Sequence, residues 1–451
     1  MNQCRFSTFL RRWASLCFFI IWPGIPGVSH ADQIPAGWRS NEMKPIGYSG
    51  LDGHGGAFKL AIRRVNDHWY LYMGHLWNRG WSIIDVTDPS NPRYLKFIEW
   101  PQQNTWTIQM ELHGNLMLTA LQRAQADGWG GDVNAPFDEG VVIWDISDPV
   151  NPKQLSHWRT GSFGVHRLGY PGGRYANVAA NMPGFRGQIL LFLDISDPQN
   201  PKEVSRWWET GQKEGEPPPP FPISFHGPAY IDGEKAYLGY ANELVILDIS
   251  DIAHPKEISH LNFWPPFKGP FGLHDAMLVP GKNILYIHSE SAGGDDSSFP
   301  ACGEPMWITG LVDIKDVATP RLMSVFPIPV PPAGESYADF CDKGGRFGPH
   351  NTNLEYHLPD VEKTGNLIYT TFFNAGLRVV NIEDPRLPKE VAWFIPPTPS
   401  TRVGPIPSNQ LVNQTEDVLV DTRGNIYITD KQWGLFVLRY TGKGQPAPTS
   451  R

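Results

Sequence analysis

The chain has 451 residues, of which 41% are hydrophobic and 12% aromatic, so it carries enough apolar side chain for a large core. Its formal net charge of −8 at pH 7 leaves no basic surface, which excludes nucleic acid as an expected partner. The 43 prolines and 45 glycines predict many tight turns between short elements.

The first 31 residues are typical of an export signal. Arginines precede an apolar stretch at 16–22, and Ser29-His30-Ala31 fits a small-x-small cleavage site. We therefore expect cleavage after Ala31 and a periplasmic or secreted mature protein. The apolar core favours the general secretory route, while the Arg11-Arg12 pair leaves the twin-arginine route open. The apolar stretch is too short and too interrupted by prolines to span a membrane, and the sequence has no other long apolar run, so we expect no membrane span in the mature chain.

A short phrase recurs six times along the chain. Its first copy reads Asp85-Val86-Thr87-Asp88-Pro89-Ser90-Asn91-Pro92, and each copy follows an apolar run and precedes a Lys or Arg with a second, shorter run. Self-similarity at a period of 49 to 68 residues indicates one supersecondary unit that is stacked several times. The copies begin at Asp85, Asp145, Asp194, Asp248, Asp313 and Asn381.

Each repeat is predicted to contain four strands, as at 228–231, 235–240, 244–248 and 255–260. The last repeat stops after three strands, and residues 43–48 resemble the fourth strand that it lacks. Pairing these two ends closes a ring and removes the exposed edges of an open array. The sequence therefore predicts an all-β, seven-bladed β-propeller with four-stranded blades. It would form a single domain over residues 32–442, followed by a disordered tail at 443–451.

The repeated phrase resembles the LVIVD repeat, a β-propeller repeat of exported bacterial proteins. The resemblance covers residues 43–441 and implies the propeller fold, but such repeats occur in proteins of varied role, so it leaves the function open. We interpret the Asp and Pro residues of the phrase as turn formers that use Asx-type hydrogen bonds and the fixed proline φ. A calcium site made by the acidic pairs is the alternative.

Four long irregular segments belong to one face of the predicted propeller, because they either lead into a first strand or join a second strand to a third. They span residues 122–140, 209–222, 289–305 and 329–348. Long loops gathered on one face of a rigid scaffold predict a binding pocket there. Cys302 and Cys341, which remain after signal cleavage, lie in two of these loops. We expect a disulfide between them, with a thiolate ligand as the alternative.

Aligning the blades at the start of their first strands places histidine at one position in five of the seven blades. Thr107 takes this position in blade two and Glu416 in blade seven. Neutral imidazoles that converge on a channel predict a transition metal, with Fe or Cu favoured and Zn or Mn open. Glu416 would be a ligand or would orient an imidazole. The alternative is a polar ring bonded to channel water. The expected ligands are His54, His166, His226, His274 and His350.

A propeller axis lined with histidines is similar in architecture to the carotenoid-cleavage oxygenases and to the selenium-binding/methanethiol oxidase group. That likeness implies metal-dependent oxidation or oxygen-dependent cleavage of a small organic substrate in the channel mouth. Glu290 and Asp339 are candidates for a general base or a further ligand, and Arg167 for a carboxylate anchor. The alternatives are a non-catalytic propeller that binds a ligand or a protein, and a metal-assisted lyase or hydrolase.

Overall fold

The structure is a computed structural model that describes residues 32–126, 129–219, 222–263, 272–290, 308–363, 365–408 and 410–443. The expected signal peptide lies outside these residues, as does the expected tail beyond residue 443. In the described ranges, helix is confined to two short 3-10 turns, η1 (Leu51–Gly53) and η2 (Asn353–Glu355). No helix there is long and apolar enough to cross a membrane.

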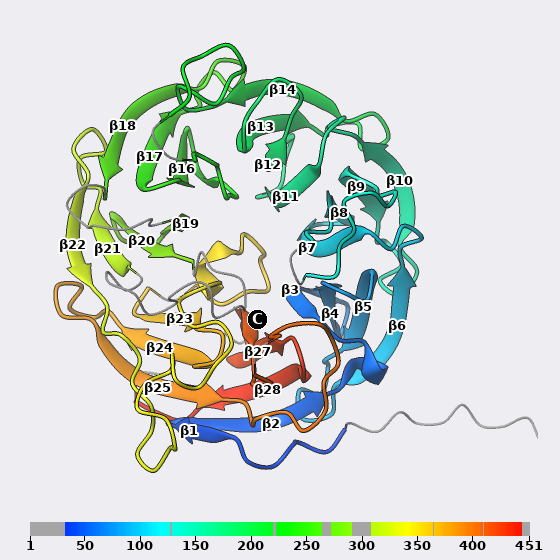
Figure 1. The fold of residues 1–451 in the computed structure, drawn as a ribbon, viewed down its shortest axis with the longest axis vertical. Helices are drawn as coiled ribbons and strands as arrows, with labels where there is room; N and C mark the ends of the chain where they lie inside the picture. The colour runs from blue at the N-terminus through cyan, green and yellow to red at the C-terminus, as the bar shows by residue number, and fades with distance from the viewer. Residues whose placement is uncertain are drawn as a thin grey trace, which may run out of the picture.

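Seven groups of antiparallel strands, here called blades, stand in a ring around a central axis (Figure 1). Single pairs at His75–Thr107 and Gln122–Gly164 join blades one to three into one twelve-stranded sheet. Within a blade the chain runs from the axis outward, and the third strand ends at the repeated phrase. Blades one to three contain β3 (Ala57–Val65), β4 (His68–His75), β5 (Gly80–Asp85), β6 (Arg93–Glu99), β7 (Thr105–His113), β8 (Leu116–Arg123), β9 (Gly140–Asp145), β10 (Lys153–Trp158), β11 (Gly164–Gly169), β12 (Tyr175–Asn181), β13 (Gln188–Asp194) and β14 (Lys202–Trp207).

The remaining four blades continue the ring and return to the first. Their strands are β15 (Tyr230–Asp232), β16 (Lys235–Tyr240), β17 (Glu243–Asp248), β18 (Lys256–Asn262), β19 (Leu273–Leu278), β20 (Ile284–Ser289), β21 (Thr309–Asp313), β22 (Arg321–Val325), β23 (Leu367–Thr371), β24 (Leu377–Asn381), β25 (Lys389–Ile395), β26 (Thr415–Val420), β27 (Asn425–Asp430) and β28 (Gly434–Tyr440).

The two ends of the chain close the ring in blade seven. Strand β2 (Met43–Ser49) pairs with β28 and supplies the fourth strand, which confirms the predicted closure (Figure 1). A further strand, β1 (Arg39–Asn41), was not predicted and pairs with β25 on the outer edge of blade six. Because β2 pairs with β28, the outer edge of β28 is not left unpaired.

Blade six departs from the predicted four strands at its innermost position. In place of a regular strand, the chain makes an isolated bridge between Thr352 and Thr370 and then forms η2. The Thr352 side chain accepts a hydrogen bond from the backbone N–H of Leu354, and the Asn353 side chain accepts one from Tyr369. Such local side-chain bonds compete with a strand ladder, which explains the irregular inner segment.

The first acidic or amide residue of each phrase forms the predicted Asx turn. Asp85 accepts a hydrogen bond from the backbone N–H of Thr87 at 2.9 Å, and all five other copies make the same i to i+2 bond. The phrase also joins neighbouring blades, since Ser205 on the fourth strand of blade three donates to the Ile252 carbonyl in the phrase of blade four. Equivalent serine bonds of 2.6–2.7 Å come from Ser156, Ser259 and Ser324.

Candidate functional site

β-Bulges at the start of the inner strands place histidines on the axis. The register of β11 shifts between Val165 and Arg167, and that of β19 shifts between Leu273 and Asp275, so His166 and His274 are the extra residues. A bulge re-aims a side chain that a regular strand would direct elsewhere.

His226 and His350 reach the same place from the irregular segments before β15 and β23. Nε2 of His166 lies 3.1 Å from Nε2 of His226. The ring centroids of His226 and His274 are 4.1 Å apart, and those of His274 and His350 are 5.0 Å apart. These four residues are called the imidazole cluster below, and the structure brings them together as predicted.

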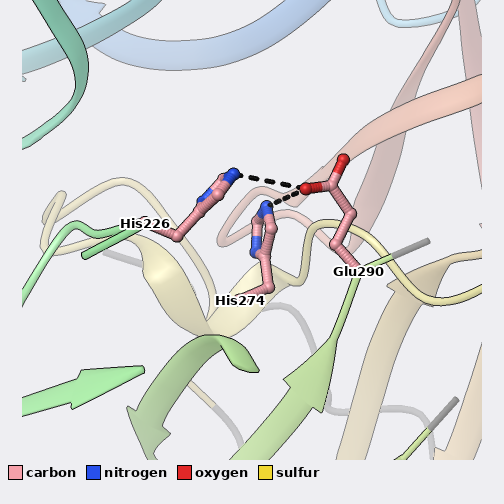
Figure 2. A group of neighbouring side chains, drawn as sticks. All are labelled: His226, His274 and Glu290. Atoms are coloured by element: carbon pink, nitrogen blue, oxygen red, sulfur yellow. Dashed lines mark ion pairs between the residues drawn. The ribbon is translucent and has the colours of Figure 1, made fainter. Parts of the chain in front are cut away.

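The Glu290 carboxylate sits against this cluster and is its acidic member. One oxygen lies 3.2 Å from Nε2 of His226 and 3.7 Å from Nε2 of His274, as Figure 2 shows, and the other lies 3.6 Å from Nε2 of His350. Burial alone would raise the pKa of Glu290. Arg346 at 2.7 Å and the surrounding imidazoles outweigh that effect and hold the pKa well below its usual range. Glu290 is therefore an anionic carboxylate at neutral pH.

The Nδ1 atoms of three imidazoles face oxygen acceptors on the side away from Glu290. Nδ1 of His166 lies 2.7 Å from Oε1 of Gln122, and Nδ1 of His274 lies 2.6 Å from Oδ2 of Asp275. Nδ1 of His350 lies 2.8 Å from the backbone oxygen of Glu416. Because these oxygens accept the Nδ1 proton, the Nε2 atoms of His166 and His350 are left as acceptors, whereas Nε2 of His274 lies 2.9 Å from Nη1 of Arg167.

Burial keeps members of the cluster neutral. Desolvation is the main cause that lowers the pKa of His166 well below its usual range, with the nearby His226 and Arg167 adding to it. Desolvation likewise dominates for His274, whose pKa falls well below the usual range although Asp275 opposes the shift. Neutral imidazole is the form that binds a metal ion.

Glu416 is held behind the cluster and not in it. Its buried carboxylate pairs with the buried Lys431 and lies 3.1 Å from Nδ1 of His350. Burial would raise its pKa, but Lys431 and His350 outweigh that effect and lower it. Of the two predicted roles, this placement matches the orienting one.

His54 does not join the cluster. Its ring stacks on Phe97 at a centroid distance of 4.0 Å, and its Nδ1 lies 3.1 Å from the Tyr94 hydroxyl. The expected alignment is wrong for blade one, because η1 inserts a turn after the closing strand and the bulge of β3 falls at Phe58 and Lys59.

Arg167 lines the cavity but is not a free carboxylate anchor. It is 1% exposed, and its guanidinium contacts Asp275 at 3.1 Å and Glu355 at 2.5 Å. Its Nη1 also lies 2.9 Å from Nε2 of His274. The carboxylates outweigh burial and raise the pKa of Arg167, so a permanent cation underlies the cluster.

Asp339 is remote from the cluster and is exposed on the 329–348 loop. Its Oδ1 accepts hydrogen bonds from the backbone N–H groups of Cys341 and Asp342, so it shapes its own turn. Cys341 is disulfide-bonded, and its expected partner Cys302 lies outside the described residues.

Several polar residues around the cluster had not been singled out from the sequence. The buried His288 on β20 lies 3.4 Å from Asp275, and His274, Asp275 and His288 form a second group with metal-ligand spacing. Arg167 pairs with the same Asp275 oxygen at 3.1 Å. The sequence signal that could have identified His288 is its position at the end of the otherwise apolar run of β20.

A second buried polar layer lies beneath the cluster. Lys59 of β3 pairs with Glu355, which also binds Arg167. Asp417 accepts hydrogen bonds from the Tyr356 hydroxyl at 2.5 Å and from the backbone N–H of Leu60. Polar side chains from inner strands that are far apart in sequence thus tie the blades together across the axis.

Glu111 of β7 faces this second layer. Its carboxyl group makes the stability of the folded protein depend on pH. Burial raises its pKa from 4.5 to about 8; Glu355 and Asp417 add to the shift, whereas Lys59 and Arg167 oppose it. The folded protein therefore keeps a proton that the unfolded chain loses above about pH 4.5. The contribution of Glu111 to the free energy of unfolding is fully present below about pH 4.5 and is lost as the pH rises towards about 8.

We expect Glu111→Gln to flatten this pH dependence by up to about 1.4 kcal/mol per pH unit. The measurement is the free energy of unfolding of wild type and variant between about pH 5 and about pH 8. Parallel curves for the two proteins would show that Glu111 does not carry the buried proton.

The cluster opens into a cavity of about 320 Å³ on the face predicted to carry the pocket. Residues at or beside each of the four long segments line it, as predicted. They are Gln125, Trp129, Ser224, Glu290 and Arg346.

Comparison with known proteins identifies the class to which this architecture belongs. The LVIVD repeat family matches residues 69–98, 135–160 and 230–262. A search of curated proteins gives no match. The fold is similar to the β-propeller domain of Cps50 (Swd1) from Myceliophteria thermophila, with 11% identity and a TM-score of 0.52, over 89% of this chain and 100% of that one.

A protein from Lactobacillus plantarum is similar at 10% identity and a TM-score of 0.50, over 85% of this chain and 98% of that one. Likeness at such low identity shows the fold alone. The chain is a β-propeller that carries LVIVD repeats, as the resemblance in the sequence implied.

Proposed function

We propose that this propeller holds one transition-metal ion on the imidazole cluster and Glu290, and that it uses the metal to oxidise or oxidatively cleave a small organic molecule. The observation that carries the proposal is that ligand atoms of His226, His274 and Glu290 lie within 4.8 Å of one another, with His166 next to His226 and His350 next to Glu290. Nε2 atoms 3.1 Å apart, beside an anionic carboxylate, form a donor set that a cation would satisfy.

The donor types favour iron or copper, since imidazoles suit both and a carboxylate adds a hard oxygen ligand; zinc and manganese are the other candidates. The bound metal would supply Lewis acidity or redox chemistry. The residues of the chain have separate tasks. Asp275, Gln122 and Glu416 hold the Nδ1 protons and orient the rings, and Arg346 fixes the Glu290 carboxylate.

The loops around the cavity would bind the substrate and limit the access of water to the reacting atoms. We also propose that the protein is exported to an oxidising compartment. The disulfide at Cys341 supports this location, since such bonds persist where thiols are not kept reduced.

Elemental analysis of the full-length mature protein tests the metal proposal. We expect about one equivalent of iron or copper per chain after purification without chelator, or after reconstitution of chelated protein. Substoichiometric binding of iron, copper, manganese and zinc in every reconstitution would overturn it and leave a propeller that binds a ligand or a protein without metal. Stoichiometric zinc as the native metal would favour the lyase or hydrolase reading over oxidation.

A further inference from the structure

The cavity has two chemically different walls. Blades three to six supply the imidazole cluster and Glu290, whereas the lining from blades one and two is mostly apolar. This wall is part of one hydrophobic cluster, and the term apolar wall refers below to Phe58, Leu76, Trp106, Ile108 and Trp129.

Two residues of the apolar wall lie in register shifts of the inner strands, as His166 and His274 do. Phe58 falls with Lys59 in the two-residue shift of β3, and Ile108 falls with Thr107 in that of β7. The corresponding shifts of β11 and β19 hold His166 and His274. The same backbone device therefore aims apolar side chains at the axis from one sector and imidazoles from the other.

Aromatic rings of the wall border the imidazoles directly. The centroids of Trp106 and Trp129 are 5.7 Å apart at an angle of 72°, and Trp106 lies 6.5 Å from His166. Aromatic pairs in offset or edge-to-face geometry are stabilised beyond the area they bury. A flat ring placed against this pair would gain that stabilisation, which an aliphatic molecule of equal area would not.

We infer, on the basis of the proposed metal-binding function, that the substrate class is a single aromatic ring with an oxygen substituent, of the phenol type. The ring lies against the apolar wall, and the oxygen faces the imidazole cluster. The cavity volume of about 320 Å³ corresponds to roughly ten water molecules, which suits one ring.

Calorimetric titration with phenol, cyclohexanol and glucose tests this inference in both metal-loaded and chelated protein. We expect phenol to bind about three- to tenfold more tightly than cyclohexanol, and glucose not to bind. Trp129→Leu should weaken phenol binding by a similar factor. The matched control is Trp208→Leu, which removes a half-buried tryptophan that packs on Phe185 outside the cavity, and it should bind phenol as wild type does.

The outcomes separate the substrate class from the metal. Phenol binding to chelated protein that depends on Trp129 supports the aromatic site even if no metal is retained. Stoichiometric metal together with equal binding of phenol and cyclohexanol, or with no effect of Trp129→Leu, overturns the aromatic assignment and leaves the metal proposal standing. Preferential binding of glucose overturns it as well.

Discussion

Replacing His226 and His274 together by alanine is expected to weaken metal binding by more than about 100-fold. Partners that only orient a ligand contribute about 10- to 100-fold, and loss of two imidazoles that contact Glu290 should exceed that range. The measurement is metal content after dialysis against a defined concentration of free metal, together with a competition titration against a chelator.

His54→Ala is the matched control for that pair. His54 leads into the first strand of blade one but stacks on Phe97, away from the cluster, so its removal should leave metal stoichiometry unchanged. Circular dichroism and the unfolding midpoint would verify that each variant is folded. Equal metal content in the double variant and the His54 variant would contradict the proposed site.

Replacing Lys59 by methionine is expected to lower the free energy of unfolding by about 3–5 kcal/mol. The Lys59 side chain is 2% exposed and that of its partner Glu355 is 1% exposed, so the substitution leaves a buried carboxylate without one of its two cations. The carboxylates also outweigh burial and raise the pKa of Lys59, which keeps this residue charged in the folded state. Denaturant unfolding at neutral pH measures the effect.

Arg206→Met provides the comparison at the surface. Arg206 pairs with Glu203 at 2.6 Å, but both side chains are about 30% exposed, so the loss should stay within about 0.5 kcal/mol. If Lys59→Met were as mild as this control, the second polar layer would not be a source of stability. The layer matters for the site because Glu355 also binds Arg167, which lies under His274.

Much of the candidate site follows from counting back from the hairpin turns. That count locates His166, His226, His274 and His350, because the number of residues between the start of the first strand and the following hairpin turn is similar in these blades. It fails for His54, where η1 adds a turn that no repeat shares. Glu290 appeared only as one loop acid among several, since its position depends on Arg346 and on three different blades.

The sequence by itself determined the β-propeller, its closure by the N-terminal strand and the blades that carry the histidines. Those features depend on local causes, namely Asx turns, proline-bearing phrases and strand patterns that repeat along the chain. Only the tertiary structure decided which imidazoles meet, which oxygens hold their protons and how Lys59, Glu355 and Arg167 neutralise one another. Bulges and contacts between strands hundreds of residues apart set these relations, and neither leaves a period in the sequence.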